Sequence, residues 1–188
     1  MSLGLTATRE IPMGVKLDLI GQMTILNNKY NARDGIQANN KGVDMLVSGE
    51  VRKPFNIRNN IVIEPQAQLI YQKLKMKDFT DGYRKVNQGN GSNIRARIGT
   101  KISYEDNSQR TYYARINLWQ NLINTSKTHI GKDVLEEKYG KNSMDIGLGV
   151  KMPIFARGNI YGDITYNKSL GNGKNDTAKA TIGIDYQF

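Results

Sequence analysis

The sequence contains no cysteine and only one histidine among its 188 residues. Without cysteine, the chain can form neither a disulfide framework nor a thiolate site of any kind. The single histidine, His129, excludes histidine-cluster metal sites and most histidine-based acid–base catalysis. The sequence also has no nucleophile–base constellation and no cofactor motif. We therefore predict no catalytic residue, no metal and no cofactor.

Long apolar runs are also missing. The mean hydropathy is −0.55, and no segment approaches the roughly 18 apolar residues that a membrane-spanning helix needs. The start of the chain has no basic region followed by an apolar stretch, so it shows no signal peptide. The chain is therefore either cytosolic or an internal or C-terminal piece of a longer protein. A membrane β-barrel stays open as an interpretation, because it needs only alternating residues.

The charge balance is basic but dispersed. The chain has 27 Lys and Arg against 17 Asp and Glu, a formal net charge of +10. Such a balance would suit a nucleic acid or an anionic membrane. However, no block of five or more Lys or Arg occurs, and we therefore predict no nucleic-acid partner.

Two loop segments carry groups that suggest chemistry but fit simpler roles better. Glu136 and Glu137 lie in a charge-rich loop, where solvated carboxylates are expected, and His129 of the same loop is expected at the surface. The segment "GNGKND" (171–176) resembles a phosphate-binding loop only superficially. It lacks the Ser or Thr and the following helix of such loops, so a flexible hairpin is the better interpretation.

Alternation of apolar and polar residues is what the sequence has in abundance. It is clear in "GVKLDLIGQMTIL" (14–26) and in "SMDIGLGVKM" (143–152). Because successive side chains of a strand point to opposite faces, this period predicts half-apolar β-strands. No comparable helical period appears. The chain is predicted to be all-β, with strands at 2–9, 14–26, 41–53, 60–76, 92–104, 109–123, 140–153, 158–168 and 177–188.

Short and long connections alternate along the chain. The predicted linkers have 4, 14, 6, 15, 4, 16, 4 and 8 residues. The short ones, such as "EDNS", are tight turns, and the long ones are polar. An antiparallel up-and-down meander with short turns at one end and long loops at the other is the layout of an outer-membrane β-barrel.

The polar face of the strands separates a membrane barrel from a soluble one. A soluble barrel would turn its apolar face inward, whereas a membrane barrel turns it to lipid and lines a wet lumen with charges. Predicted strands of 11–15 residues suit a membrane crossing. We expect Leu148 on the lipid face and Gly149 on the lumen face, with arginine better tolerated at Gly149. Aromatic residues gather at the short-turn ends, as an interfacial girdle requires: Phe55, Tyr104, Tyr112, Phe155, Tyr186 and Phe188.

The last strand, "TIGIDYQF" (181–188), ends in an aromatic residue. Ile182, Ile184, Tyr186 and Phe188 share one face. Such a strand resembles the signal that bacterial barrel proteins present to the outer-membrane β-barrel assembly machinery. An unpaired, apolar strand edge suits capture by the open strand of a partner.

Three internal segments resemble the C-terminal translocator of autotransporters, the type V secretion proteins. These are "IVIEPQAQLIYQ" (61–72), "GSNIRARIGTKISY" (91–104) and "YYARINLWQN" (112–121), in the order and spacing of that family. The first matches almost letter for letter; in the second, Ala96 stands where glycine is common. The resemblance covers roughly residues 14–188.

The resemblance implies a twelve-stranded transmembrane barrel threaded by an N-terminal helix that joins it to a secreted passenger. We count about nine strands and no such helix, so we expect residues 1–188 to be the C-terminal portion of one barrel domain, lacking the first strands.

The predicted function is a non-enzymatic outer-membrane translocator that delivers an attached passenger to the cell surface. Glu64, Arg97 and Arg115 are predicted to form a lumen charge network that keeps the pore wet and positions the threaded segment. The expected partners are outer-membrane lipid, the assembly machinery and the passenger. A soluble basic β-barrel binding module and a small passive porin-like channel remain alternatives.

Overall fold

A computed structural model describes residues 1–31, 37–80, 85–88, 91–124, 127–130, 133–136, 141–155, 157–171 and 176–186. In these ranges the chain is almost entirely β-strand, as the alternation predicts. The described residues include no helix long and apolar enough to cross a membrane.

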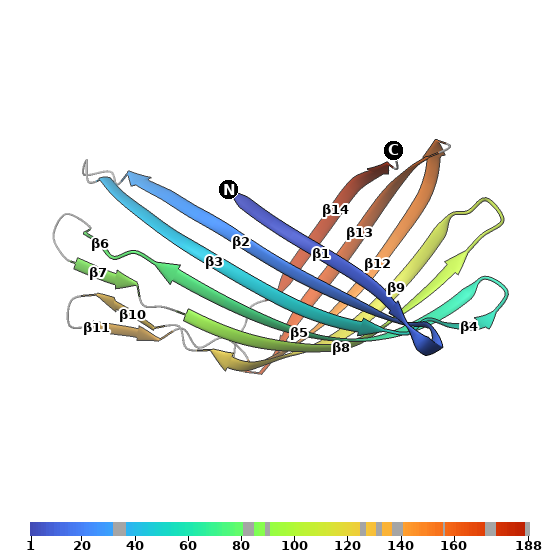
Figure 1. Ribbon diagram of the computed structural model, residues 1–188, viewed down its shortest axis with the longest axis horizontal. Coiled ribbons are helices and arrows are strands. Elements are labelled where there is room, and N and C mark those ends of the chain that lie inside the picture. The colour runs from blue at the N-terminus through green and yellow to red at the C-terminus, as the bar shows by residue number, and fades with distance from the viewer. Residues whose placement is uncertain are drawn as a thin grey trace.

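One large antiparallel meander forms most of the molecule (Figure 1). Its strands follow one another in chain order: β1 (Ser2–Ile11), β2 (Val15–Asn31), β3 (Gln37–Arg52), β5 (Ile61–Met76), β8 (Gly91–Glu105), β9 (Thr111–Asn124), β12 (Asn142–Phe155), β13 (Gly158–Leu170) and β14 (Thr177–Tyr186). The short β4 (Phe55–Arg58) pairs with β5 next to their turn. The up-and-down all-β architecture is therefore confirmed.

Compact turns close the short end of each hairpin. Between β1 and β2 the chain passes through the 3₁₀ turn η1 (Pro12–Gly14), in which Met13 and Gly14 take φ of 71° and 72°. Between β8 and β9, the Asp106 side chain accepts hydrogen bonds from the backbone N–H groups of Ser108 and Arg110, at 2.9 and 3.0 Å. These local bonds hold the turn that "EDNS" predicts.

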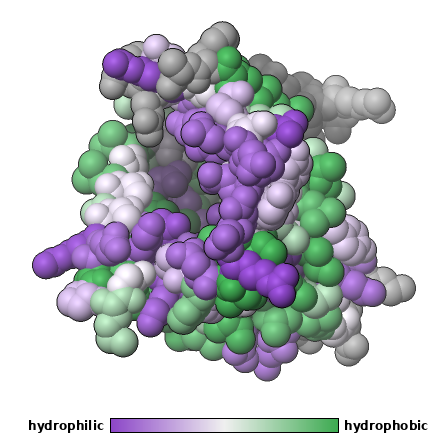
Figure 2. Space-filling model, turned by 90° about the vertical axis from the view of Figure 1, so that its right-hand side faces the viewer, coloured by the Kyte–Doolittle hydropathy of each residue, from purple (hydrophilic) through white to green (hydrophobic). Residues whose placement is uncertain are grey.

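The sheet is curled, and its two faces differ in polarity. Figure 1 shows the strands bending around a common hollow, with the short turns towards one end. Figure 2, seen from that end, shows hydrophilic residues gathered in the hollow and hydrophobic residues over much of the outer side. On the outer face, Leu148, Ile164 and Ile182 are 62%, 66% and 81% exposed. The polar face is thus the inner one, as expected for a barrel that meets lipid with its outside.

The long connections contain structure that the sequence did not predict. Most of the expected loop 27–40 is a continuation of the β2–β3 hairpin, which pairs out to Asn31 and Gln37. The connections after β5 and β9 contribute β6 (Phe79–Thr80), β7 (Lys85–Gln88), β10 (Lys127–Ile130) and β11 (Asp133–Glu136). These four strands form a second small sheet, in the order β11-β10-β7-β6.

The two ends of the meander are not paired with each other in the described residues. β1 pairs with β2, and β14 pairs with β13 over ten residues from Thr177 to Tyr186. Each therefore keeps one open edge. The predicted terminal aromatic, Phe188, lies outside the described residues.

Candidate functional site: the inner face of the sheet

The inner face carries the three charged residues that the sequence singled out. Glu64 lies in β5, Arg97 in β8 and Arg115 in β9. They do not contact one another; each belongs to a different group of polar contacts within the described residues. These three residues therefore belong to three separate charge clusters of the inner face, each completed by a residue that was not singled out from the sequence.

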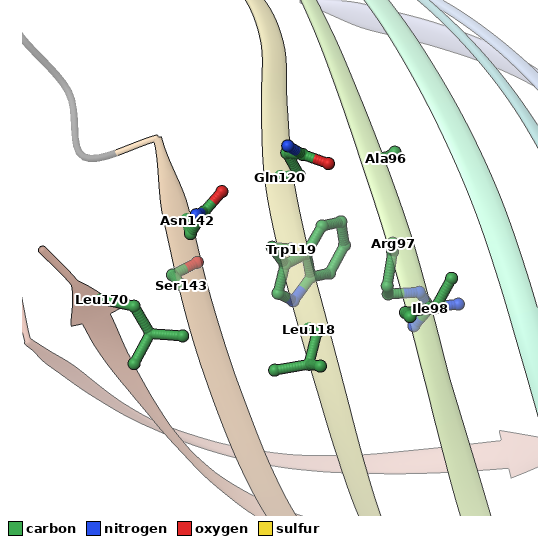
Figure 3. A pocket seen from close by; sticks show the side chains of 9 residues that line it. All are labelled: Ala96, Arg97, Ile98, Leu118, Trp119, Gln120, Asn142, Ser143 and Leu170. Atoms are coloured by element: carbon green, nitrogen blue, oxygen red, sulfur yellow. The ribbon is translucent and has the colours of Figure 1, made fainter.

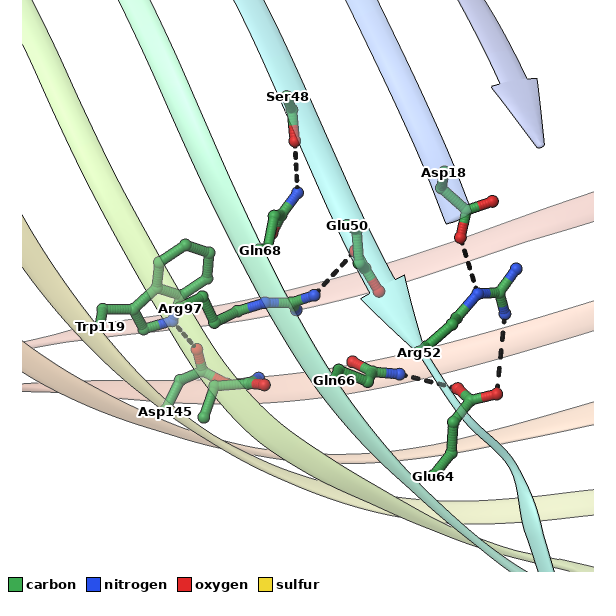
Figure 4. A network of polar contacts seen from close by, with 11 residues as sticks. Asp18, Ser48, Glu50, Arg52, Glu64, Gln66, Gln68, Arg97, Trp119 and Asp145 are labelled. Carbon is green, nitrogen blue, oxygen red and sulfur yellow. Dashed lines mark hydrogen bonds and ion pairs between the residues drawn. The ribbon is translucent and has the colours of Figure 1, made fainter. Parts of the chain in front are cut away.

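The first cluster is centred on Arg52 (Figure 4). The Nε of Arg52 lies 2.7 Å from Asp18, and its Nη1 lies 3.8 Å from Glu64. Glu64 also accepts a hydrogen bond from Gln66 at 2.8 Å, and Asp18 accepts one from Thr8 at 2.6 Å. One arginine thus links β2, β3 and β5 near their short-turn end.

The second cluster joins strands that are not neighbours. Arg97 of β8 lies 2.8 Å from Glu50 of β3, and β5 lies between these strands. The Arg97 and Glu50 side chains are 13% and 19% exposed. Alternate strands lie about 9.6 Å apart, so the two long side chains bridge that distance over β5, and the inward curl of the sheet shortens it.

Trp119 is the centre of an aromatic and polar group that sequence reasoning missed. Its ring lies 4.1 Å from the Arg95 guanidinium and 5.4 Å from that of Arg97, measured to the ring centroid. Figure 3 shows Trp119 and Arg97 side by side on neighbouring strands. Its indole N–H donates to Asp145, which is 6% exposed and also accepts from Asn117 at 2.7 Å. The sequence feature that could have identified Trp119 is its position in the strand alternation. It lies on the same face as Arg115 and Asn117 rather than with the apolar residues.

The third cluster surrounds Asp163 of β13. Arg115 reaches it from β9 at 2.8 Å, across the intervening β12, and also donates to Thr165 at 2.6 Å. The Tyr113 hydroxyl donates to the same carboxylate at 3.2 Å. In all three clusters, opposite charges are paired within the sheet, and the paired side chains face the hollow.

Two inner-face glycines are covered by tyrosine rings from the adjacent strand. A Cβ at Gly149 would lie 2.2 Å from the Tyr113 ring, and one at Gly183 would lie 2.3 Å from Tyr161. These contacts are the aromatic covering of glycine seen in curved sheets. An arginine at Gly149 would therefore require the Tyr113 ring to move. That arginine is better tolerated at Gly149 than at Leu148 stays a prediction.

The hollow is lined by these charges. A space of about 420 Å³ adjoins β8, β9, β12, β13 and β14, bordered by Arg95, Arg115, Asp145, Asp163 and Lys179 among others. Among the residues that the structure describes, no group of three or more His, Asp or Glu side chains is placed to hold a metal ion. The arrangement favours holding water and polar chain rather than a small apolar ligand.

The predicted assembly strand presents an apolar outer face. Ile182, Ile184 and Tyr186 of β14 are 81%, 70% and 54% exposed. Phe55, Tyr104 and Tyr112 are also exposed on the outer face, near the same short-turn end of the sheet. Their placement matches the expected aromatic girdle.

The curled meander, its apolar outside and its charged inner face are those of a membrane β-barrel. The chain belongs to the autotransporter beta-domain family, whose model matches residues 1–165. Localisation to the bacterial outer membrane follows from this membership.

Solved structures support the same fold. The chain is similar to the translocator domain of the autotransporter NalP from Neisseria meningitidis, with a TM-score of 0.82 at 14% identity, covering 100% of this chain and 66% of that one. It is also similar to the beta domain of the Bordetella autotransporter BrkA, with a TM-score of 0.75 at 19% identity, covering 100% of this chain and 72% of that one.

A curated relative is similar in sequence over part of the chain. The protein named "Probable autotransporter YfaL" from Escherichia coli K12 is 28% identical over 109 residues, which is 57% of this chain and 9% of that protein. The chain thus matches a small share of that relative's length.

Proposed function

We propose that this domain delivers a covalently attached passenger across the outer membrane, with a segment of the same polypeptide passing along its inner face. The observation that carries the proposal is the charge-lined hollow, in which Glu64, Arg97 and Arg115 are held by partners within the sheet. Paired charges stay hydrated without attracting a permanent counter-ion, so a polar chain can lie against them. The role proposed is transport, without catalysis.

A photo-crosslinking experiment in the full-length protein tests this proposal. A photoreactive amino acid at Thr165, which borders the hollow, should crosslink to the protein's own upstream segment in intact cells. The matched control is the neighbouring Ile164, which is 66% exposed on the outer face and should crosslink to no such segment. A passenger that stays inaccessible to external protease while the barrel is folded would contradict the proposal and favour a passive channel.

We also propose that the last strand is recognised by the β-barrel assembly machinery. The exposed Ile182, Ile184 and Tyr186 support this role, because an extended strand with an apolar face suits capture by the open strand of a partner. We assign residues 166–188 to the same domain, because β14 continues the sheet.

Deleting Phe188 tests the assembly role. The deletion should lower the folded fraction in outer membranes, measured by heat-modifiable mobility, while synthesis and export stay unchanged. The reason is that the strand recognised by the assembly machinery loses an apolar contact worth about 1.5–3 kcal/mol. Phe188→Tyr should retain most of the insertion. Insertion of the deletion variant at the wild-type level would refute the signal.

A further inference from the structure

Five lysines gather at the long-loop ends of β2, β3 and β5, on the left in Figure 1. They are Lys29, Lys41, Lys73, Lys75 and Lys77, which we call the lysine patch. The strand alternation places Lys73 and Lys75 on the same face as Tyr71, which is 41% exposed on the outer side. Lys29, Lys41, Lys75 and Lys77 are exposed. The patch therefore lies on the outer face, whereas the three charge clusters lie inside.

Two members of the lysine patch face each other directly. The backbone N–H of Lys77 donates to the carbonyl oxygen of Lys41 at 2.8 Å, which continues the β3–β5 pairing by one residue. Like charges directly opposite on neighbouring strands destabilise a sheet. Within the described residues, none of the five lysines has an ion pair with a carboxylate.

Two carboxylates of the described residues, Asp44 and Asp78, lie near the lysine patch. Asp44 faces inward and accepts two hydrogen bonds from Gln72, both at 3.0 Å. Asp78, which follows Lys77, has a contact of its own. Among the described residues, the printed ion pairs therefore include none that neutralises these lysines, and their positive charges lie close together on the outer face.

The lysine patch lies directly beside exposed apolar residues on the outer face of β2 and β3. Met45 of β3 pairs with Lys73 of β5, and Ile25 of β2 lies beside Val43, which pairs with Lys75. Met23, Ile25 and Met45 are exposed on the lipid-facing side. Lysine side chains in this position extend their ammonium groups to the membrane interface while their stems cover apolar surface.

We propose that the lysine patch binds the phosphate groups of the phosphorylated glycolipid in the outer leaflet of the outer membrane. The chemistry is that of clustered ammonium groups at an interface, which bind anionic headgroups. The proposal rests on the proposed transport topology, in which the long-loop end of the barrel faces outward. Bound phosphate offsets the repulsion between Lys41 and Lys77.

Binding to lipid A bicelles tests the proposal. The full-length protein is refolded in phosphatidylcholine bicelles, and its affinity is measured for added lipid A that carries both phosphates. The variant Lys41→Gln, Lys75→Gln, Lys77→Gln should bind at least tenfold more weakly. The matched control Arg9→Gln, Arg58→Gln, Arg157→Gln removes the same charge from exposed positions at the opposite end and should bind like wild type. Lys→Arg at the three patch positions should retain binding.

Equal weakening in both Gln variants would show a net-charge effect only and overturn the proposal. Undiminished binding of dephosphorylated lipid A would overturn it as well. Folding of each variant is checked by heat-modifiable mobility. The bicelle experiment measures lipid A binding independently of how the protein is oriented in a cell. Loss of lipid A binding is therefore distinguishable from loss of passenger delivery, which the Thr165 crosslink measures in cells.

Discussion

Arg97 and Glu50 form an ion pair of 2.8 Å although an entire strand, β5, separates the strands that carry them. The two side chains reach each other over β5 on the inner, concave side of the sheet. Arg115 and Asp163 repeat the arrangement across β12. These two ion pairs therefore connect alternate strands on the inner face of the curved sheet.

Breaking the Arg97–Glu50 pair should destabilise the barrel. Arg97→Gln leaves a mostly shielded carboxylate without its partner, which should cost about 1–3 kcal/mol in the free energy of unfolding. Urea unfolding of the full-length protein in lipid vesicles measures the loss. In a double-mutant cycle with Glu50→Gln, the double variant should lose less than the sum of the two single variants. Strict additivity would show that the pair contributes nothing.

Arginine should be tolerated on the inner face and not on the outer face. Leu148→Arg puts a charge at a 62% exposed lipid-facing position and should cost about 2–4 kcal/mol. Thr181→Arg is the matched inner-face control, because Thr181 is the direct register partner of Asp163 on the inner face. The measurement is the folded fraction after insertion into vesicles. Equal damage at both positions would reverse the assignment of the faces.

Gly149 should resist any larger side chain. Gly149→Val forces the Tyr113 ring to move and should cost about 1–3 kcal/mol of unfolding free energy. Adding Tyr113→Ala should recover part of the loss. Gly21→Val is the control, because a Cβ there has no neighbour within 4 Å. If Gly21→Val is as harmful as Gly149→Val, the ring contact is not the cause.

External protease should distinguish the two ends of the barrel. On intact cells that express the full-length protein, added protease should cut within 77–91 or 124–139 and spare the turn at 105–108, because only the long connections face outward. The fragments are identified by mass spectrometry. Cleavage confined to the short turns would mean the opposite topology.

The β8–β9 turn should loosen at acidic pH. Hydrogen bonds from the backbone N–H and the guanidinium of Arg110, and from the backbone N–H of Ser108, hold the pKa of Asp106 below its ordinary value. The contribution of these bonds is complete above the ordinary aspartate pKa and disappears as pH falls through the lowered value. The amide NMR shifts of Ser108 and Arg110 in micelles should titrate together in that range. Asp106→Asn should abolish the titration.

The strands were predictable because their period is encoded locally. Between Val15 and Ile25 all residues but Ile20 show by their polarity, or as a glycine in phase with apolar residues, which face they occupy, and the hairpin turns fix the order of strands. Trp119 shows the limit of this reasoning: its phase could be recognised, but its contacts with Arg95 and Asp145 depend on the register of three strands. Nothing in a single strand encodes that register.

The polar partners were less predictable for the same reason. Glu64, Arg97 and Arg115 could be placed on the inner face, but their ion pairs involve residues 12 to 48 positions away in sequence. The contact of Tyr113 with Gly149 was missed because a glycine at an inner position looks like empty space. The strands in the long connections were missed because "TSKTHIGKDVLEEK" is mostly polar, and its few apolar residues do not alternate with polar ones.

Because β7 pairs with β10, a change in the length of one long connection affects the other. His129 pairs with Asn87, so the segments that follow β5 and β9 share one hydrogen-bond ladder. An insertion in one segment would shift its register against the other, whereas an exchange of both together would preserve it. The pair should therefore be transplanted between related barrels as a single cassette. An epitope tag is better placed at the β2–β3 hairpin, where residues 28–31 pair with 37–40 and, among the described residues, no third strand joins that part of the ladder.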